Sequence, residues 1–445
     1  MIKDMTVGNP SKILLFFSLP MIAGNILQQL YSIIDSMIVG NFVGADALAA
    51  VGASYPITFV LITIANGCGI GCGVIISQYF GGKFIDKVKT SIFTSIIFIT
   101  LFSLLIMVLG VIFYSNILSL INTPKDIFEQ SCIYMKIYFW GVVFLFVYNI
   151  INSSFNALGN SKTPLLFLIL SSFLNIILDL LFVIKFQMGV AGAAYATFIC
   201  QIISAVLSLF FLLKSTKNIH YKEKIIFFDL SILKNMFKIV IPSILQQSIV
   251  SIGNLFVQAL VNSYGIIVIA GYAAAIKIDS ITILPMVNMS NAVSTFTGQN
   301  IGANKPERIK NGYKGALIII GGFCAFTAIT LFLFGHKLIG LFVNSSSNSS
   351  VIDIGVQYMK IVSLFYFFMG LMVITNGILR GSGDMKIFLL STLTNLSTRI
   401  IFAYTLAFLI GQSAIWWAIP CGWILASTIS VIRYKSGKWK SKSVI

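Results

Sequence analysis

The chain has 445 residues, of which 58% are hydrophobic and 10% are charged, and its mean hydropathy is +0.96. These values exclude an ordinary soluble domain and indicate an integral membrane protein. A net charge of +17 would favour nucleic-acid binding in a soluble protein. In a membrane protein the same surplus fits basic loops beside anionic lipid, so we expect membrane lipid and no nucleic acid as a partner.

Twelve apolar runs follow one another along the chain. Most exceed the ~20 residues that an α-helix needs to cross a hydrocarbon core of ~30 Å. A helix satisfies its backbone hydrogen bonds internally, so we predict an all-α integral membrane protein. The twelve helices are expected near residues 13–40, 50–80, 91–113, 127–157, 164–184, 190–213, 232–262, 270–300, 313–342, 351–380, 387–410 and 413–434.

The first predicted helix, 13–40, contains a proline and an acid. Pro20 removes one backbone hydrogen bond, so it is expected to act as a hinge. Asp35 is one of three acids well inside the predicted helices, with Asp179 and Asp279. A charge in the membrane costs roughly 2.5 to 3.5 kcal/mol on insertion scales, so these acids are expected to serve function.

The second predicted helix contains the glycine-rich run Gly67-Cys68-Gly69-Ile70-Gly71-Cys72-Gly73. Small residues at this spacing let helices approach closely, which explains the run better than a metal or nucleotide site does. All six cysteines of the chain fall in or beside apolar runs, so they are expected to be free thiols.

Polar side chains in the fifth and sixth predicted helices form a candidate cation site. Asn175 precedes Asp179 by four residues, which puts both on one helical face, and Thr197 offers a hydroxyl from the next helix. Carboxylate, amide and hydroxyl oxygens suit sodium, and a carboxyl in an apolar bundle can also exchange a proton. Hydrogen bonding between neighbouring helices is the alternative role for each of these residues.

The second half of the chain repeats motifs of the first half at a nearly constant spacing. The paired positions are Gly44 and Gly265, Gln78 and Gln299, Tyr134 and Tyr358, Asn152 and Asn376, and Gly159 and Gly383. Such a repeat predicts two six-helix lobes of the same topology, related by a pseudo-two-fold axis along the membrane normal. The expected parts are an N-lobe at 1–213, a cytoplasmic linker at 214–231, a C-lobe at 232–434 and a basic cytoplasmic tail at 435–445.

The second half departs from the first in its internal charges. Arg399 stands at the position of the repeat that matches Asn175. Lys277 is only two residues from Asp279 and cannot face it across a helical turn. We therefore predict a charge pair between Asp279 and Arg399, with substrate or ion binding as the alternative.

Basic residues predict the orientation. They concentrate at both ends of the chain and in the even-numbered connections, whereas the odd-numbered connections contain only Lys125, Lys185 and Lys337. By the positive-inside rule, both termini are expected on the cytoplasmic side of the cell membrane. We also expect the protein to be a monomer.

Several motifs together resemble the multidrug and toxic compound extrusion (MATE) family, in particular its DinF-like branch. They are Ser77-Gln78-Tyr79-Phe80-Gly81-Gly82, Asn156-Ala157-Leu158-Gly159-Asn160, Gly298-Gln299-Asn300-Ile301-Gly302-Ala303 and Leu379-Arg380-Gly381-Ser382-Gly383. The resemblance covers essentially the whole chain. It implies a secondary antiporter that exports cationic or amphipathic organic compounds in exchange for protons or sodium by alternating access.

The resemblance also implies roles for individual residues. Asp35 resembles the acid of the family's first helix, and Asn175, Asp179 and Thr197 resemble the N-lobe cation site. Pro20 resembles the point at which the first helix bends. The residues that resemble lining of the substrate cavity are Gln28, Tyr31 and Asn152. The seventh helix has no acid and the tenth has none deep inside it, at positions that another bacterial branch uses for sodium.

Other functions fit the sequence less well. A lipid or lipid-linked oligosaccharide flippase of the same superfamily would be expected to have a more cationic cavity, for which Arg399 and Lys277 are the only signs. A passive channel would not explain acids confined to one lobe. An integral membrane enzyme would need clustered acids, histidines or a metal motif near one interface, and we therefore predict a protein that is not an enzyme. Gly381-Ser382-Gly383 lacks the spacing of a nucleotide-binding loop. We expect no cofactor, and no metal other than sodium at the coupling site.

Overall fold

The structure, a computed structural model, describes residues 3–217, 226–342 and 349–445. These residues form helices and connecting turns, and they contain no strand. Eleven of the described helices are long and apolar enough to cross a membrane, and a bent pair of shorter helices brings the number to twelve. The predicted all-α membrane fold is therefore confirmed.

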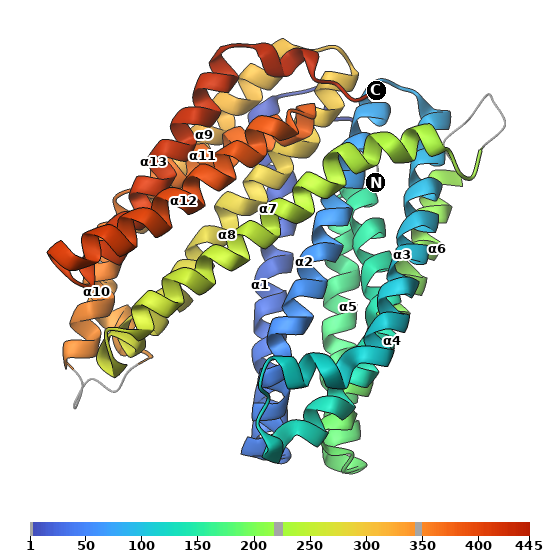
Figure 1. Cartoon of the computed structure of the whole chain (residues 1–445). Helices are drawn as coiled ribbons and strands as arrows, with labels where there is room; N and C mark the ends of the chain where they lie inside the picture. The colour runs from blue at the N-terminus through green and yellow to red at the C-terminus, as the bar shows by residue number, and fades with distance from the viewer. Residues whose placement is uncertain (1–2, 218–225, 343–348) are drawn as a thin grey trace. The chain divides into compact units, whose positions relative to one another are not determined.

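The first compact unit, called unit 1 here, consists of Ala23–Ile244 together with the short segment up to Asp4. It contains most of α1 and the first part of α7 (Figure 1). Its helices have these bounds: α1 Pro10–Phe42, α2 Ala45–Gly81, α3 Ile85–Leu120, α4 Lys125–Ala157, α5 Lys162–Asp179, the π-helix η1 Leu180–Lys185, α6 Gly189–Lys217 and α7 Leu230–Asn262.

The second compact unit, unit 2, consists of Met5–Ile22 and Leu245–Ile445. It includes the first part of α1 and the last part of α7. Its further helices are α8 Ile266–Gly302, α9 Pro306–Gly340, α10 Ser349–Ser363, α11 Tyr366–Ser382, α12 Met385–Ile410, α13 Ser413–Lys435 and the 3-10 helix η2 Lys438–Ser441. Chain order alone assigned all of α1 to the N-lobe and all of α7 to the C-lobe, whereas the compact units divide both helices.

Contacts of the N-terminal segment explain why the start of α1 belongs to unit 2. The buried Met5 donates its N–H to Oε1 of Gln299 at 2.8 Å, and its carbonyl accepts a hydrogen bond from Nη2 of Arg308 at 3.2 Å. Further along, a methyl group on Gly315 of α9 would overlap Ser11 of α1. The repeated glutamine motif therefore anchors the segment that leads into α1.

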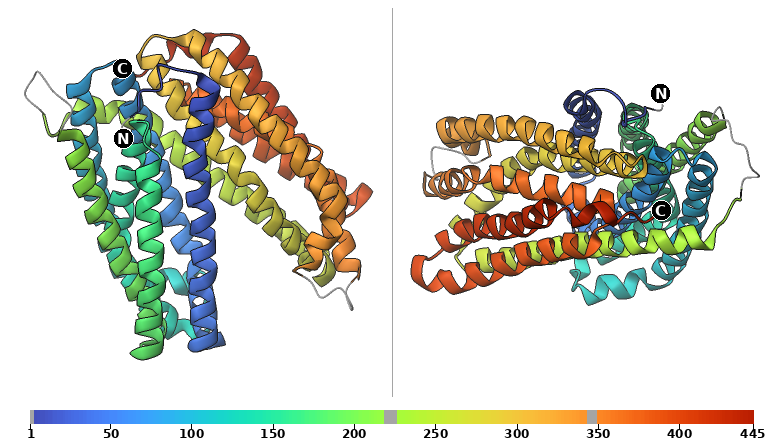
Figure 2. Two further views of the ribbon diagram at one scale, coloured as in Figure 1. Left: turned by 180° about the vertical axis from the view of Figure 1, so that it is seen from behind. Right: turned by 90° about the horizontal axis from the view of Figure 1, so that it is seen from above.

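In unit 1, α4 contacts α2, α3, α5 and α6, and the helices of this unit run side by side (Figure 2). The glycine-rich run of α2 allows close approach on two faces. A Cβ on Gly69 would lie 3.0 Å from the Asn149 carbonyl oxygen of α4, and one on Gly71 would lie 2.6 Å from Cα of Val240 of α7. Alternate glycines of the run thus serve two different helix contacts, as small residues do in membrane bundles.

In unit 2, α11 lies between α8 and α13. Two glycines spaced by four residues, Gly377 and Gly381, bring α11 against α8. A Cβ on Gly377 would lie 2.6 Å from the Ser290 carbonyl oxygen, and one on Gly381 would overlap the Ser294 carbonyl oxygen. The backbones of these two helices are therefore in direct contact, which fixes the side chains between them.

The tenth predicted span is broken, which corrects the prediction of one helix over 351–380. It consists of α10 and α11, bent by 53° at Leu364 and Phe365. No proline or glycine marks the break. The tyrosines on either side, Tyr358 and Tyr366, both donate to the carboxylate of Asp279, so a contact distant in sequence accompanies the bend.

Two glycines of the repeat pack closely against segments near the two ends of the chain. Gly159 and Gly383 both have positive φ, 77° and 91°. A Cβ on Gly159 would overlap the carbonyl of Lys3 in unit 1, and one on Gly383 would lie 2.6 Å from the Lys442 carbonyl oxygen in unit 2. The C-terminal tail is therefore packed on its unit, with Trp439 buried.

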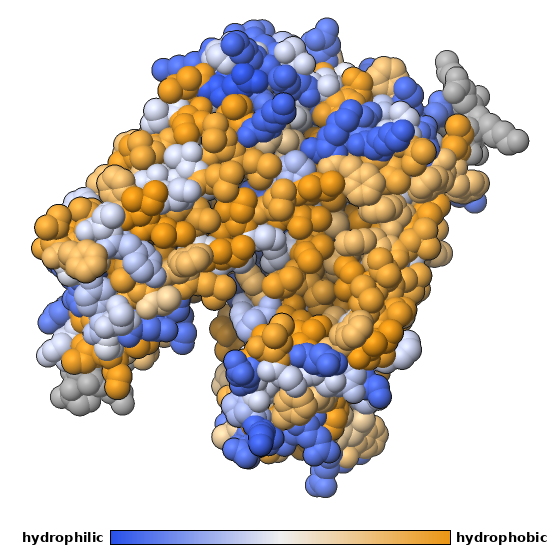
Figure 3. Space-filling model, in the orientation of Figure 1, coloured by the Kyte–Doolittle hydropathy of each residue, from blue (hydrophilic) through white to orange (hydrophobic). Residues whose placement is uncertain are grey.

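The surface of each unit carries an apolar band. In Figure 3, orange apolar side chains cover the middle of each unit and blue hydrophilic side chains gather at its ends. Many large apolar side chains of both units are exposed, such as Leu105 and Phe326. This distribution fits helices surrounded by lipid.

Candidate functional site

Three helices of unit 1 carry polar stripes at helical spacing. Side chains separated by three, four and seven residues lie on one face of a helix, so each stripe points in one direction. The stripes are Gln28, Tyr31 and Asp35 on α1, Ser171, Ser172, Asn175 and Asp179 on α5 with Asp179 as its last residue, and Thr197, Cys200, Gln201 and Ser204 on α6.

The two carboxyl groups of Asp35 and Asp179 interact electrostatically with each other. Asp179 is 0% exposed and Asn175 is 3% exposed, while Asp35 is half-buried. Oδ1 of Asp35, both carboxylate oxygens of Asp179 and Oδ1 of Asn175 are buried without a hydrogen-bond partner among the described residues. Four oxygen atoms from two helices therefore lack a hydrogen-bond donor from any other described side chain, and the two carboxyl groups interact with each other.

Tyrosines surround the acid pair. Tyr31 and Tyr134 each interact electrostatically with both acids. Tyr134 stacks on Tyr138, with ring centroids 6.1 Å apart and an angle of 23° between the planes. Apolar ring surface beside the pair lowers the local polarity, which strengthens charge interactions there.

A cavity of ≈ 100 Å³ lies on one side of the acids, within unit 1. Gln28 and Tyr31 of α1, Asn175 of α5 and Thr197 of α6 line it, so the predicted residues meet there. Its other lining residues are Leu145, Tyr148, Leu168, Ser171, Ser172, Cys200, Gln201 and Ser204. Most of these side chains carry a hydroxyl or an amide group, and the leucines and tyrosines add apolar surface. The wall therefore suits water, an ion or an organic molecule with polar groups.

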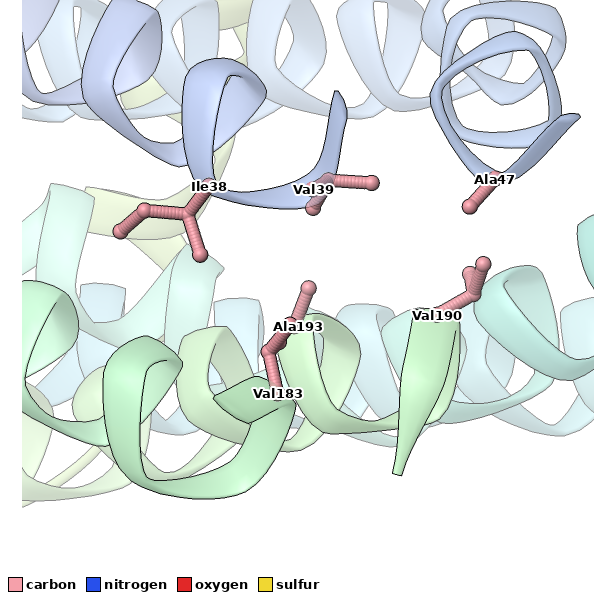
Figure 4. Close-up of a cluster of buried hydrophobic side chains, with 6 residues drawn as sticks. All are labelled: Ile38, Val39, Ala47, Val183, Val190 and Ala193. Carbon is pink, nitrogen blue, oxygen red and sulfur yellow. The ribbon is translucent and has the colours of Figure 1, made fainter. Parts of the chain in front are cut away.

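An apolar cluster lies on the other side of the acids, at the end of unit 1 where α1 ends. Figure 4 shows Ile38 and Val39 of α1 and Ala47 of α2 facing Val183, Val190 and Ala193 from η1 and α6. Three of its members lie one turn from a polar site residue: Val39 follows Asp35 by four residues, Val183 follows Asp179 by four, and Ala193 precedes Thr197 by four.

Unit 1 is therefore layered along its helices. The cavity with its polar side chains comes first, then the acid pair, and then an apolar seal. The π-helix η1 begins directly after Asp179, and π-turns frequently accompany functional sites. The six buried members of the apolar cluster carry no polar group, whereas most residues that line the cavity do, so the polar approach to the carboxyl groups lies on the cavity side.

The acid pair has the properties of a site for one small cation. Two adjacent carboxylates in an apolar environment cannot both stay charged at low cost, so a proton or a bound cation must neutralise them. Two carboxylates and the amide of Asn175 suit sodium as well as a proton, and Thr197 offers a hydroxyl from the wall of the adjoining cavity. Within the described part of the chain, no group of three or more His, Cys, Asp or Glu side chains is placed to hold a metal ion.

Two other predicted residues lie away from this cavity. Oδ1 of Asn152 accepts a hydrogen bond from Nδ2 of Asn156 at 3.3 Å, and Asn152 is not among the residues that line the cavity. Pro20 lies inside the continuous helix α1 and belongs to unit 2, three residues before α1 enters unit 1 at Ala23. Its repeat mate Pro242 lies at the corresponding point of α7, just before Leu245.

In unit 2, the structure gives Asp279 partners that the sequence did not indicate. Asp279 is 6% exposed and accepts hydrogen bonds from Tyr366 at 2.6 Å and from Tyr358 at 3.1 Å. Arg399 forms no ion pair with it within the described residues. The guanidinium instead donates to Oδ1 of Asn254 at 3.2 Å and interacts with Asp279 at longer range.

Several cavity residues were not predicted, although a signal was present. Cys200, Gln201 and Ser204 follow Thr197 by three, four and seven residues, which is the spacing of a single helical face. Extending the polar stripe from the predicted Thr197 would have found them. Tyr148 of α4 precedes the predicted Asn152 by four residues and Asn156 by eight, so the same spacing would have found it too.

Comparison with known proteins identifies one family. The MatE family profile matches residues 20–181 and 242–405. The second match is offset from the first by nearly the same spacing as the internal repeat. Together the two matches cover most of the chain.

Two relatives and one solved structure illustrate the match. The chain is 32% identical to the "Probable multidrug resistance protein YpnP" of Bacillus subtilis (strain 168), over 98% of both chains. It is 24% identical to the "Multidrug export protein MepA" of Staphylococcus aureus (strain N315), over 84% of this chain and 82% of that protein. The fold is similar to the "Outward-facing conformation of a multidrug resistance MATE family transporter of the MOP superfamily", with a TM-score of 0.89, 23% identity and 98% coverage of both chains.

Proposed function

We propose that this chain, which belongs to the MatE family of membrane transporters, exports organic compounds by antiport against protons or sodium. The names of the curated relatives point to drugs as substrates, and the negative charge of the acid pair favours cationic or amphipathic ones. The observation that carries this proposal is the pair of Asp35 and Asp179, whose buried oxygens lack hydrogen-bond donors among the described residues.

The ion step would take place at the acid pair. A proton or sodium ion arriving through the cavity would bind between Asp35 and Asp179, with oxygens of Asn175 and Thr197 completing the site. Binding would remove the repulsion between the carboxylates, so the occupied state would be the more stable one. This arrangement of the site is the feature by which we assign the chain to the DinF-like branch.

The substrate step would use the same cavity. Gln28 and Tyr31 line it on α1, the helix that also contributes Asp35. An organic cation and a coupling cation would therefore compete for the same negative charge, which is the basic requirement of exchange. Alternating access would follow, with α1 bending at Pro20 as the two ligands replace each other.

The membrane potential can drive this cycle. One elementary charge that crosses a potential of 100 mV gains ~2.3 kcal/mol, before any ion gradient is added. We further propose that the protein works as a monomer in the cell membrane, with both termini in the cytoplasm, because basic residues concentrate in the connections on that side.

Transport under imposed gradients tests the proposal. Inside-out membrane vesicles that contain the protein would be given a pH gradient, a sodium gradient or neither, and the uptake of a fluorescent organic cation would be measured. We expect uptake to require one of the two gradients and to stop when that gradient is collapsed. Equal uptake without any gradient would contradict antiport.

A further inference from the structure

Arg380 of α11 stands out among the four arginines of the chain, all of which lie in unit 2. Arg433 forms an ion pair with Asp384 at 2.5 Å, and Arg399 interacts with Asp279. Arg308 is half-buried and bonds to neutral groups. Arg380 is only 7% exposed and has no acidic partner among the described residues.

The guanidinium of Arg380 has neutral neighbours only. Nε donates to the Ser294 hydroxyl at 3.2 Å, and Nη2 donates to Oδ1 of Asn291 at 2.7 Å, both on α8. The group also lies 5.9 Å from the ring centroid of Phe388 on α12. No hydrogen bond joins Nη1 to a described residue, and Nη1 is not among the fully buried atoms without a partner, so it remains open to a ligand.

The Arg380 side chain does not extend into bulk water. Arg380 lies two residues before the end of α11, where a long side chain could extend toward water. It instead reaches back along α11, because helical side chains point toward the N-terminus, and it contacts α8 well before the end of that helix. A buried charge without a counter-charge is costly, so an unmatched guanidinium here calls for an anionic partner.

We propose that Arg380 and Asn291 bind an oxyanion, either the carboxylate of an amphiphilic substrate or the phosphate of an anionic lipid. Nη1 of Arg380 would donate a charge-assisted hydrogen bond, and the Nδ2 amide of Asn291, whose Oδ1 is already engaged, would donate a second. Gly377 and Gly381 hold α11 against α8 and fix both donors. This site is independent of the cation exchange proposed for unit 1.

Binding of two related dyes tests the carboxylate source. The full chain, purified in phosphatidylcholine nanodiscs, would be titrated with a rhodamine that carries a free benzoate and with the ethyl ester of the same dye. Arg380→Gln should weaken binding of the free acid at least about tenfold relative to the ester, as expected for a lost charge-assisted hydrogen bond. Arg380→Lys keeps the charge and should restore part of the preference.

Lipid retention tests the phosphate source. The same variants would be purified from membranes rich in phosphatidylglycerol, and bound lipid would be measured by native mass spectrometry. If lipid occupies the site, Arg380→Gln should lose a phosphatidylglycerol that the wild type retains. Lys386→Gln, which removes an exposed cation six residues away, is the matched control for both measurements.

The proposal is wrong if Arg380→Gln, folded as judged by a single symmetric gel-filtration peak, behaves like Lys386→Gln in both measurements. It is also wrong if Arg380→Gln weakens both dyes equally and leaves lipid retention unchanged. Neither measurement needs an ion gradient, so failure of the proposed antiport would not affect them.

Discussion

The acids inside the two units differ in their hydrogen-bond partners. In unit 1, Asp35 and Asp179 face each other, and their buried oxygens lack donors within the described residues. In unit 2, Asp279 receives hydrogen bonds from two tyrosine hydroxyls. The repeat therefore does not produce two equal sites. Unit 1 leaves negative charge for a ligand to neutralise, whereas unit 2 satisfies its acid with its own side chains.

The repeat also shows a difference in charge between matching positions of the two units. Arg399 stands where unit 1 has Asn175, so unit 2 carries a fixed cation at the position of a predicted ion ligand. All four arginines of the chain belong to unit 2, while unit 1 contains the facing acids Asp35 and Asp179. The two related bundles therefore differ in charge at this matching position.

The largest effect is expected from the acids of unit 1. Asp35→Asn and Asp179→Asn keep the side-chain size but remove the charge, and a loss of about 1.4 kcal/mol or more in cation binding lowers ion-driven transport at least about tenfold. Efflux of a cationic dye from energised cells, normalised to protein abundance, measures this. Asp279→Asn is the matched control and should keep most of its transport. Full efflux by both unit 1 variants would show that these acids are not needed for transport and would contradict the proposed difference between the units.

Stability should change in the reverse order. Asp279→Ala leaves two buried tyrosine hydroxyls without an acceptor, which costs about 1 to 3 kcal/mol. Asp179→Asn, at a position without donors, should not lower stability. Thermal unfolding of the purified variants, followed by a thiol-reactive dye, measures both. If Asp179→Asn lowered the unfolding temperature more than Asp279→Ala, the hydrogen bonds to Asp279 would not account for the stability of the two sites.

The apolar seal is expected to prevent ion leakage. Val183→Thr keeps the shape of the side chain but adds a hydroxyl to the cluster, which favours water there. Proteoliposomes with this variant should lose an imposed ion gradient several-fold faster than the wild type in the absence of substrate. Val351→Thr, at a buried valine of α10 in unit 2, is the control. Equal leakage by both variants would argue against a seal specific to unit 1.

The smallest effect is expected from the hydroxyl of Thr197. Thr197→Val removes one neutral ligand while both carboxylates stay, and a neutral hydrogen bond or ligand contributes about 0.5 to 1.5 kcal/mol. The concentration of the coupling ion that gives half-maximal transport should rise about two- to tenfold. Thr398→Val, at the buried threonine beside Arg399, should leave it unchanged. A complete loss of transport in Thr197→Val would mean that the hydroxyl has another role.

The sequence predicted the helices and the acids because both have strong local signals. A long apolar run indicates a membrane helix, and an acid inside it is rare enough to be informative. In the polar stripe of α6 only Thr197 was predicted, although the other three residues follow it at the spacing of one helical face. The family match then supported the repeat and the class of protein.

Other features depend on contacts that no local pattern encodes. The division of α1 between the units follows from Met5 binding to Gln299, which is 294 residues away. The break between α10 and α11 and the partners of Asp279 also depend on distant tyrosines. For the same reason the predicted charge pair of Asp279 and Arg399 is only partly confirmed: the two groups interact at longer range, but they form no ion pair among the described residues.

Ion movement in proteoliposomes tests most directly whether cation exchange belongs to unit 1. Substrate would be loaded inside, and the resulting uptake of protons or sodium would be recorded for the wild type, for the double variant Asp35→Asn and Asp179→Asn, and for Asp279→Asn. We expect uptake in the wild type and in Asp279→Asn, and none in the double variant. Substrate-dependent uptake that persists in the double variant but disappears in Asp279→Asn would place the exchange in unit 2 and contradict our central claim.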